Sequence, residues 1–290
     1  MNKTNRARGM LIAAMFVFGT LGPFVRKIGV SSGELALYRA ILAAVLVGGF
    51  LLVTRQKLRL RSLGKELLLL LLSGMAMGIN WILLFEAYKY TTVSAATLSY
   101  YFAPVIVTVL SPILFREKLT PVQILCFLFS TLGLVLITGF GIQGGGQDLI
   151  GILFGLGAAV FYATVMILNK RIRKVAGLQR TFLQFLAAIA VLLPYVLSTG
   201  GFHLDTLDGA GWGNLLIVGL VHTGITYCLY FSALKDLPGQ QAAILSYIDP
   251  LVAVLVSVIW LDETMGPMQI IGGVLILGFT LWNELTPRKT

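Results

Sequence analysis

The segment "TLSYYFAPVIVTVLSP" at residues 97–112 has a close counterpart in "ILSYIDPLVAVLVSVI" at residues 244–259. Each segment lies in an apolar run of about 20 residues, the length that a helix needs to cross a bilayer. Each also carries a proline near its middle, Pro104 in the first and Pro250 in the second. An aspartate, Asp249, precedes only the second proline, and Ala103 takes its place in the first. The pair predicts a duplicated membrane helix with an ionisable group in one copy only.

The composition of the whole chain agrees with a membrane protein. Hydrophobic residues make up 57% of the 290 residues, charged residues only 12%, and the mean hydropathy is +0.89. Soluble proteins carry roughly twice that share of charge. We therefore expect an all-α integral membrane protein with ten transmembrane helices. The ten apolar runs cover residues 9–28, 34–53, 66–87, 92–115, 121–139, 149–169, 178–198, 212–233, 239–260 and 266–284.

Lysine and arginine are distributed unevenly between the two sides of these spans. With the amino terminus placed inside, all but four of the 22 lysines and arginines fall at the inner side. The exceptions are Arg26, Lys27 and Lys89 at the outer side and Arg39 inside the second span. Because basic residues favour the cytoplasmic side, we expect both termini in the cytoplasm and a location in the inner (plasma) membrane of a bacterium. The formal charge of +10 is then a topology signal, and we expect no nucleic-acid partner.

The duplication extends over both halves of the chain. The domain prediction is a first five-helix repeat at 1–140, a glycine-rich joint at 141–148 and a second five-helix repeat at 149–290. A slip of two residues extends the match to the first span of each half, where 18–28 lies against 162–172. A shift of 146 positions pairs Gly78 with Gly224, Phe85 with Phe231, Lys89 with Lys235, Tyr101 with Tyr247, Pro104 with Pro250, Glu117 with Glu263, Pro121 with Pro267 and Gln123 with Gln269.

The odd number of helices in each repeat has a geometric consequence. Because each repeat has five spans, the second must insert upside down relative to the first. Two halves related by an axis in the membrane plane can exchange conformations and open a midplane site to either side in turn. The inverted repeat therefore favours a transporter, although a channel or an integral membrane enzyme could also be built in this way.

Two long stretches carry a family resemblance. They are "FEAYKYTTVSAATLSYYFAPVIVTVLSPILFREKLTPVQ" at 85–123 and "YFSALKDLPGQQAAILSYIDPLVAVLVSVIWLDETMGPMQ" at 230–269. Together with the repeat of five helices, they resemble the EamA-type members of the drug/metabolite transporter superfamily over essentially the whole chain. The resemblance implies a ten-helix permease, often an exporter of amino acids or related metabolites, with a central cavity between the halves. It does not imply a particular substrate.

The two mid-span prolines are candidate gates. Pro104 and Pro250 each lack the backbone N–H that would bond to the preceding turn, so we expect a kink at each. Paired kinks in the fourth and ninth spans could let the halves bend around a cavity. They could also be static bends, which membrane helices carry routinely.

Ionisable residues lie inside the predicted spans. Asp249 is costly at such a depth unless it is paired or hydrated, and it indicates a polar pathway or a proton site; alternatively, it is a neutral acid bonded to a carbonyl that the kink frees. His222 in the eighth span could change charge near neutral pH, or it could simply join two helices. Together the two could couple transport to protons, and each alone could orient a zwitterionic substrate. Arg39 could hold a substrate carboxylate or pair with Glu34.

Aromatic and small polar residues at matching positions of the two repeats are candidate cavity residues. Rings with polar tips could line a site for amphipathic molecules, such as amino acids with apolar side chains. Residues 18–20 and 162–164 could instead serve close packing of the first helices near the axis. The predicted cavity consists of Phe18, Thr20, Asn80, Trp81, Tyr101, Tyr162, His222, Tyr227, Ser246, Tyr247 and Asp249.

The sequence offers little for enzyme chemistry. The stretch "GIQGGGQD" at 141–148 lacks the Lys-Ser/Thr pair of a phosphate-binding loop, and no metal-ligand spacing occurs. We expect no enzyme, no cofactor and no metal site, and we expect the energy to come from an ion or substrate gradient. The leading interpretation is a secondary transporter that exports small amphipathic metabolites, amino acids first, as a monomer or homodimer. The alternatives are an uptake permease, a membrane sensor or a lipid transporter.

Overall fold

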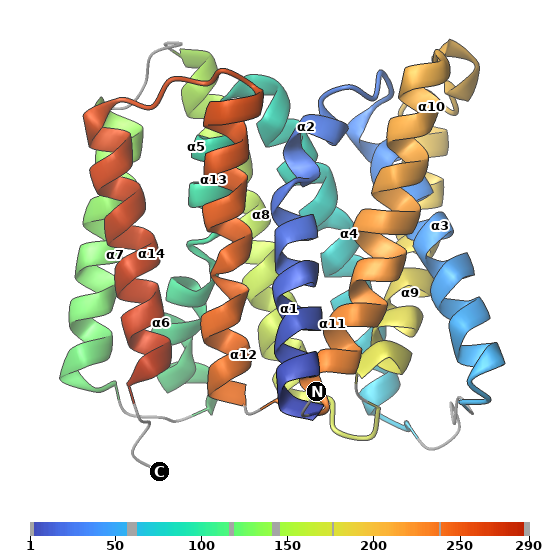
Figure 1. The fold of residues 1–290 in the computed structure, drawn as a ribbon, viewed down its shortest axis with the longest axis horizontal. Coiled ribbons are helices and arrows are strands. Elements are labelled where there is room, and N and C mark those ends of the chain that lie inside the picture. The colour runs from blue at the N-terminus through green and yellow to red at the C-terminus, as the bar shows by residue number, and fades with distance from the viewer. Residues whose placement is uncertain are drawn as a thin grey trace.

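Figure 1 shows the computed structural model of the chain, which describes residues 3–56, 63–115, 119–140, 146–175, 177–237 and 239–286. All regular structure within these ranges is helical. The first half contains α1 (Lys3–Gly19), α2 (Leu21–Val25), α3 (Ser32–Val53), α4 (Glu66–Tyr90), α5 (Val93–Tyr100), α6 (Ala103–Phe115) and α7 (Pro121–Phe140). The second half contains α8 (Gly146–Arg171), α9 (Gly177–Ser198), η2 (Leu204–Thr206), α10 (Gly209–Leu216), η3 (Ile217–Ile225), α11 (Thr226–Leu234), α12 (Gly239–Ser246), α13 (Ile248–Trp260) and α14 (Pro267–Leu285).

All ten predicted spans are helical, but four of them are interrupted. The single helices are α3, α4, α7, α8, α9 and α14. The first span consists of α1 and α2, the fourth of α5 and α6, the eighth of α10, η3 and α11, and the ninth of α12 and α13. Helix count and order therefore follow from the hydrophobic pattern, whereas the interruptions do not.

The fourth and ninth spans break at matching places. In the fourth span α5 ends at Tyr100, and in the ninth α12 ends at Ser246. Pro104 and Pro250 then lie in the first turn of the helix that follows, where a missing N–H leaves no intrahelical bond unmade. Instead of the kink in a continuous helix that the sequence predicted, each proline follows a break into two helices.

The first and eighth spans are interrupted in other ways. Thr20 separates α1 from α2, and its hydroxyl donates to the carbonyl of Val17 at 2.8 Å. The middle of the eighth span, η3, is a π-helix, in which the backbone bonds join residues five apart. The side chains of His222, Thr223 and Thr226 follow the same spacing, because each contacts the carbonyl five residues before it. The wide helix therefore coincides with the polar part of this span.

The two fifth helices, α7 and α14, run antiparallel to each other. Phe129 of α7 stacks on Phe279 of α14 with ring centroids 4.4 Å apart, and further along α7 Gly133 lies against Gly272, which comes earlier in α14. A Cβ on Gly272 would lie 2.5 Å from the carbonyl oxygen of Gly133, so the close approach requires glycine. Because equivalent helices run in opposite directions, the repeats are inverted, as the odd span count predicts.

The two repeats pack on each other through most of their helices. α4 of the first repeat packs on α8 and α9 of the second, α3 packs on α9 and η3, and α1 packs on α11 and α13. The second span of each repeat thus contacts the third span of the other. Leu37, Phe85 and Phe185 are fully buried in the core that results. A site at the centre of the molecule is therefore shared by both repeats.

The outer surface of the bundle is apolar, which fits a lipid environment. Large apolar side chains such as Val45, Ile113, Ile259 and Val274 are more than half exposed on it. Within the described residues, six segments are long and apolar enough to cross a membrane: Ser32–Val53, Glu66–Tyr90, Val93–Leu114, Gly146–Arg171, Gly177–Ser198 and Gly209–Leu234. The protein is an all-helical, multi-pass membrane protein.

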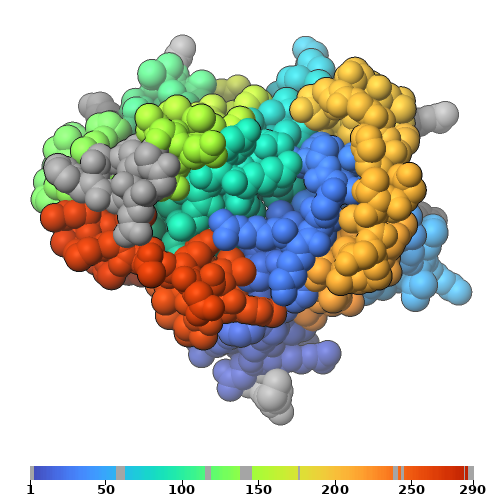
Figure 2. Space-filling model, turned by 90° about the horizontal axis from the view of Figure 1, so that it is seen from above, coloured from blue at the N-terminus to red at the C-terminus, as the bar shows by residue number. Residues whose placement is uncertain are grey.

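The two ends of the bundle are packed differently. α1 begins and α14 ends at the lower end in Figure 1. Figure 2 looks onto the opposite, upper end, where the segment that contains α2 lies against α10 and α13, and α13 lies against α5. At the lower end, α6 packs on α7 and α8, and α12 packs on α1 and α14, but among the described residues α6 and α12 are not a closely packed pair with each other. The fourth and ninth spans therefore meet through their upper halves.

Candidate functional site

The two breaks bring a tyrosine and an acid together across the repeats. Tyr101, just after α5, donates from Oη to Oδ2 of Asp249 in α13, with an oxygen–oxygen distance of 2.5 Å. Asp249 lies in the first turn of α13, where the positive end of the helix dipole favours a carboxylate. Both side chains are half-buried. The break thus holds an ionisable group between the repeats, where the first repeat has Ala103.

Three tyrosines lie beside this acid. Tyr100 at the end of α5 stacks on Tyr162 of α8 with ring centroids 5.1 Å apart, and it meets Tyr101 edge-on at 5.6 Å. Tyr101 and Tyr162 were predicted from the sequence. Tyr100 was missed, although its place directly before Tyr101 was a usable signal.

Arg39 of α3 adds a buried positive charge to this centre. The residue is only 4% exposed, and its Nε donates to Oγ1 of Thr223 in η3 at 2.6 Å. Its guanidinium lies over the ring of Trp81, 4.5 Å from the ring centroid. Both charges lie at the contact between the repeats, since Arg39 of α3 donates to η3 and Asp249 of α13 accepts from Tyr101. A cation from the first repeat and an acid from the second therefore share one region of the interface.

Glu34 has other partners than Arg39. It accepts a bond from the backbone N–H of Ser31 at 3.2 Å and from that of His203 at 2.6 Å, and the Nδ1 atom of His203 is 3.1 Å from its carboxylate. Residues five positions apart point to different faces of a helix. Glu34 therefore joins the upper ends of α3 and the segment after α9, while Arg39 points to the centre.

Tyr227 of α11 is the middle of a second aromatic group. Its ring is 5.2 Å from that of Phe18 in α1 and 5.5 Å from that of Phe185 in α9, both edge-on. Phe185 also packs on Trp81 at 5.8 Å. Phe185 was missed because one apolar residue in an apolar span carries no signal.

His222 lies in a contact between the first and eighth spans. Its Nε2 is 3.0 Å from Oγ1 of Thr20, and its Nδ1 is 3.3 Å from the carbonyl of Ile217. The ring packs on that of Phe24 at 4.9 Å, and the residue is almost fully buried. His222 and Asp249 therefore belong to separate hydrogen-bonded groups, and joint proton coupling stays a prediction.

The three other predicted cavity residues lie at helix contacts and helix ends. Asn80 is buried, and its Nδ2 donates to the carbonyl of Ala158 at 2.6 Å, which ties α4 to α8. Ser246 donates to the carbonyl of Ala242 within α12 at 2.8 Å. Tyr247 lies at the break between α12 and α13. A cavity role for these three residues stays a prediction.

A charged cluster, here named the upper latch, ties the upper ends of the repeats. It consists of Arg26, Glu263 and the start of α5. Arg26 contacts Glu263 with an N–O distance of 2.6 Å and donates from Nη2 to the carbonyl of Thr91, also at 2.6 Å. Glu263 accepts from the backbone N–H groups of Val93 at 2.9 Å and Ser94 at 3.4 Å. An acid of the second repeat thus caps a helix of the first, where the helix dipole favours it.

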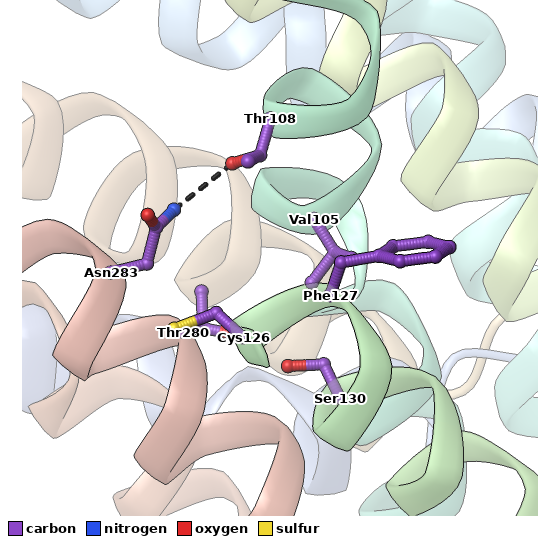
Figure 3. Close-up of a pocket in the computed structure, with 7 residues that line it drawn as sticks. All are labelled: Val105, Thr108, Cys126, Phe127, Ser130, Thr280 and Asn283. Atoms are coloured by element: carbon purple, nitrogen blue, oxygen red, sulfur yellow. Dashed lines mark hydrogen bonds between the residues drawn. The ribbon is translucent and has the colours of Figure 1, made fainter. Parts of the chain in front are cut away.

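A small cavity lies away from this centre, between α6, α7 and α14 (Figure 3). It has room for about one water molecule, so it is too small for a metabolite. Asn283 donates to Oγ1 of Thr108 at 3.0 Å across it. None of the predicted cavity residues lines it. The lining residues are Val105, Thr108, Cys126, Phe127, Ser130, Thr280 and Asn283.

The fold and its centre define a class of protein: a multi-pass helical membrane protein whose two inverted repeats hold ionisable and aromatic groups between them. Residues 7–139 and residues 149–283 each match the EamA-like transporter family. The chain therefore belongs to the EamA-like transporter family.

Several full-length relatives support this assignment. An uncharacterized transporter of Archaeoglobus fulgidus is 31% identical over 281 residues, which cover 94% of this chain and 95% of its own. Uncharacterized transporter YxxF of Bacillus subtilis is 29% identical over 275 residues, 91% of this chain and 86% of its own. Threonine/homoserine exporter RhtA of Escherichia coli is 26% identical over 270 residues, 93% of this chain and 86% of its own. A crystal structure of a protein with 18% identity superposes with a TM-score of 0.65 over 94% of this chain and 95% of that chain, so the fold is shared.

These comparisons confirm the family and the fold class that the repeated segments predicted. They also confirm that the protein is a transporter and not an enzyme. In the part of the chain that the structure describes, no three His, Cys, Asp or Glu side chains gather into a group that could hold a metal ion.

Proposed function

We propose that this transporter exports small amphipathic metabolites, with amino acids as the leading substrate class, by alternating access to a site between its two repeats. The observation that carries the proposal is that the two repeats contribute opposite charges to their interface: Arg39 lies over the ring of Trp81, and Asp249 is bonded to Tyr101. The ring of Tyr100 meets that of Tyr101 edge-on. A zwitterion with an apolar side chain has matching features, because it offers both charges and an apolar surface.

The relative RhtA supports the same substrate class. Its name describes an exporter of threonine and homoserine, which are both small amino acids, and its similarity to this chain extends over 93% of the residues. At 26% identity the two proteins need not share a substrate. The comparison therefore supports export of amino acids as a class and leaves the individual amino acid open.

The difference between the two ends of the bundle supports alternating access. The upper latch holds α2, α5 and the segment between α13 and α14 together, whereas at the lower end the described residues of α6 and α12 do not pack closely on each other. Such a packing is expected of a state whose central site faces the lower end. The breaks before Pro104 and Pro250 would act as hinges, because a broken helix bends at little cost.

The distribution of charge supports a cytoplasmic lower end. Within the described residues, basic side chains near the upper end are Arg26, Lys27 and Lys89. Those near the lower end include Arg6, Arg8, Lys65, Lys170, Arg171, Arg173, Lys174 and Lys235. We therefore propose a bacterial plasma membrane location with both termini in the cytoplasm. Because one chain supplies both repeats, we propose that it works as a monomer or a homodimer.

Mass spectrometry of the culture medium tests the proposal. Cells that produce the wild-type chain, an empty vector, Asp249→Asn or His222→Ala are grown in parallel. The two variants are kept separate because the two side chains belong to separate hydrogen-bonded groups. We expect one or a few amino acids to accumulate outside only with the wild type, and to fall toward the vector level with Asp249→Asn.

The outcomes separate the alternatives. A metabolite that is depleted from the medium by the wild type would indicate uptake. Identical media from all four cultures would contradict export of endogenous metabolites and would favour transport of foreign substrates or of lipids.

A further inference from the structure

We infer that Arg39 is the residue that selects substrates with a carboxylate, and that Asp249 takes the ammonium group of the same molecule. The inference rests on the proposed function and names the chemistry by which the central site would recognise an amino acid. It concerns two charges that the inverted repeats contribute separately, one from α3 and one from α13.

The guanidinium of Arg39 has unused hydrogen-bonding capacity. An arginine has five N–H donors, and here Nε donates to Thr223. The other contacts of Arg39 with the described residues are with the ring faces of Trp81 and Phe85, at 4.5 and 5.6 Å from the centroids. Rings attract a cation but accept no ordinary hydrogen bond. The two terminal nitrogens therefore have donors available for a ligand.

The acids nearest to Arg39 are already engaged. Glu34, on the same helix, accepts bonds from Ser31 and His203 at the upper end. Asp249 forms no ion pair with Arg39 among the described residues, and its Oδ2 accepts the bond from Tyr101. A buried arginine without a bonded counter-ion is unfavourable unless another group supplies the negative charge. A substrate carboxylate would supply that charge.

Two neighbours, Thr223 and Trp81, fix the orientation in which the guanidinium of Arg39 would bind a carboxylate. The Nε of Arg39 donates to the hydroxyl of Thr223. That hydroxyl in turn donates to the carbonyl of Val218 at 2.8 Å, five residues earlier in the π-helix. The ring of Trp81 supports the flat face of the guanidinium. A planar fork held in this way matches a carboxylate through two parallel bonds, which a lysine cannot reproduce.

The two charges would bind a zwitterion across the repeat interface. Arg39 would take the carboxylate, and Asp249 with the hydroxyl of Tyr101 would take the ammonium group. The apolar side chain would then lie among the rings of Tyr100 and Tyr227. Because the two anchors belong to opposite repeats, such a ligand would contact both halves that move in alternating access.

Amino-acid amides provide a direct probe of this inference. They keep the shape and the ammonium group but lose the negative charge. The purified full-length chain is placed in proteoliposomes, and exchange of labelled L-threonine is competed with L-threonine, L-homoserine, L-leucine, L-threoninamide and L-leucinamide. We expect the acids to compete and the amides to be at least tenfold weaker, because a site built for a charged group rejects an analogue that lacks it. This comparison needs no variant.

Variants then assign the effect to Arg39. We expect Arg39→Gln to raise the half-saturating concentration of the acids at least tenfold while the competition by amides changes little, and Arg39→Lys to fall between the two. Arg180→Gln is the matched control, because Arg180 is a partly buried arginine of α9 that donates to the carbonyl of Asn169 at 3.4 Å, outside the proposed site. Melting temperatures in detergent identify any variant that fails to fold.

The outcomes distinguish this inference from the proposed function. Exchange of amino acids that is equally sensitive to amides, or unchanged in folded Arg39→Gln, would overturn the role of Arg39 and leave amino-acid transport standing. Arg39-dependent exchange of L-lactate without exchange of amino acids would support the carboxylate site and contradict the proposed substrate class. Absence of exchange for every acid would overturn both.

Discussion

In the fourth span the helix stops after Tyr100 and resumes at Ala103, and in the ninth it stops after Ser246 and resumes at Ile248. The two breaks share a tyrosine and a proline at equivalent positions, yet their surroundings differ. Ala103 is fully buried in a small apolar cluster. Its counterpart Asp249 is half-buried and bonded to Tyr101 of the other repeat.

The third and eighth spans also differ in polarity, and again the second repeat has the polar side chains. α4 is a regular helix with Ala76 and Met77 at the positions where the π-helical η3 has His222 and Thr223. Thr223 holds Arg39, and His222 contacts Thr20. The inverted repeat thus supplies a symmetric scaffold, while His222, Thr223 and Asp249 of the second copy have apolar counterparts in the first. Four substitutions test how the two repeats differ.

The largest effect is expected from Asp249→Asn, which removes the acid from the second break. Asparagine has the same shape and can still accept from Tyr101, but it cannot release a proton. If proton coupling runs through Asp249, uphill transport driven by a pH gradient falls to background. Exchange at saturating substrate persists, but its half-saturating concentration rises, because asparagine can accept a bond from the ammonium group without offering a charge. Transport into proteoliposomes with and without an imposed pH gradient measures both.

Asp236→Asn is the matched control for this change. Asp236 follows α11 and is exposed at the lower end, so its neutralisation should leave uphill transport unchanged. Full uphill transport by Asp249→Asn would show that the acid is not a coupling residue. Loss of exchange together with uphill transport would indicate that Asp249 is needed for binding alone.

The second change places an acid in the first break. Ala103→Asp would bury a carboxyl group against Ala159 and Ala163, in a cluster whose partly buried neighbours are apolar except for the ring of Tyr162. We expect the free energy of unfolding to fall by roughly 2–5 kcal/mol, which thermal melting in detergent would reveal as a lower midpoint. Ala103→Ser, with a small hydroxyl that can bond to its own helix, should cost much less. Equal stability of both variants would show that the first break also accommodates an acid.

Much of this fold could be predicted from the sequence, because the hydrophobic runs and the repeat are local or periodic signals. All ten spans, their inversion and the family follow from these signals. These features depend on residue type along one segment, and no knowledge of a partner segment is needed.

The partners of the polar side chains could not be predicted in this way. Arg39 was considered as a partner of Glu34, which is near in sequence, but its hydrogen bond is to Thr223, 184 positions away. That contact depends on how α3 packs on η3 and on the extra width of a π-helical turn, neither of which the apolar pattern records. The two breaks were predicted as kinks, because a proline signals a lost bond and does not reveal how far the chain departs from a helix.

A moderate effect is expected from Tyr101→Phe, which removes the bond between the two breaks and keeps the ring. A hydrogen bond to a charged group contributes about 1.5–3 kcal/mol, so we expect substrate exchange to slow by about tenfold or more. Tyr90→Phe is the control, because Tyr90 is a partly exposed tyrosine at the upper end of α4 that stacks on Phe154. Exchange rates of the two variants that agree within twofold would mean that the bond to Asp249 has no part in transport.

The smallest effect is expected from Glu263→Gln, which removes the ion pair that joins the two repeats at the upper end. Glutamine keeps one acceptor for the start of α5 but loses the ion pair with Arg26, so we expect the free energy of unfolding to fall by about 1–2 kcal/mol. Glu86→Gln removes the more exposed pair with Lys89, and a change of about 0.5 kcal/mol or less is expected there.

A double-mutant cycle with Arg26→Gln identifies the source of this effect. If the pair acts as a unit, the double variant is more stable than the sum of the two single changes predicts. If it also holds the upper end closed, Glu263→Gln shifts the equilibrium toward states that open upward, and a thiol reagent applied from that side would label a cysteine placed at Ser94 faster than in the parent. Additive stabilities and unchanged labelling would mean that the close packing of α5 and α13 alone closes the upper end.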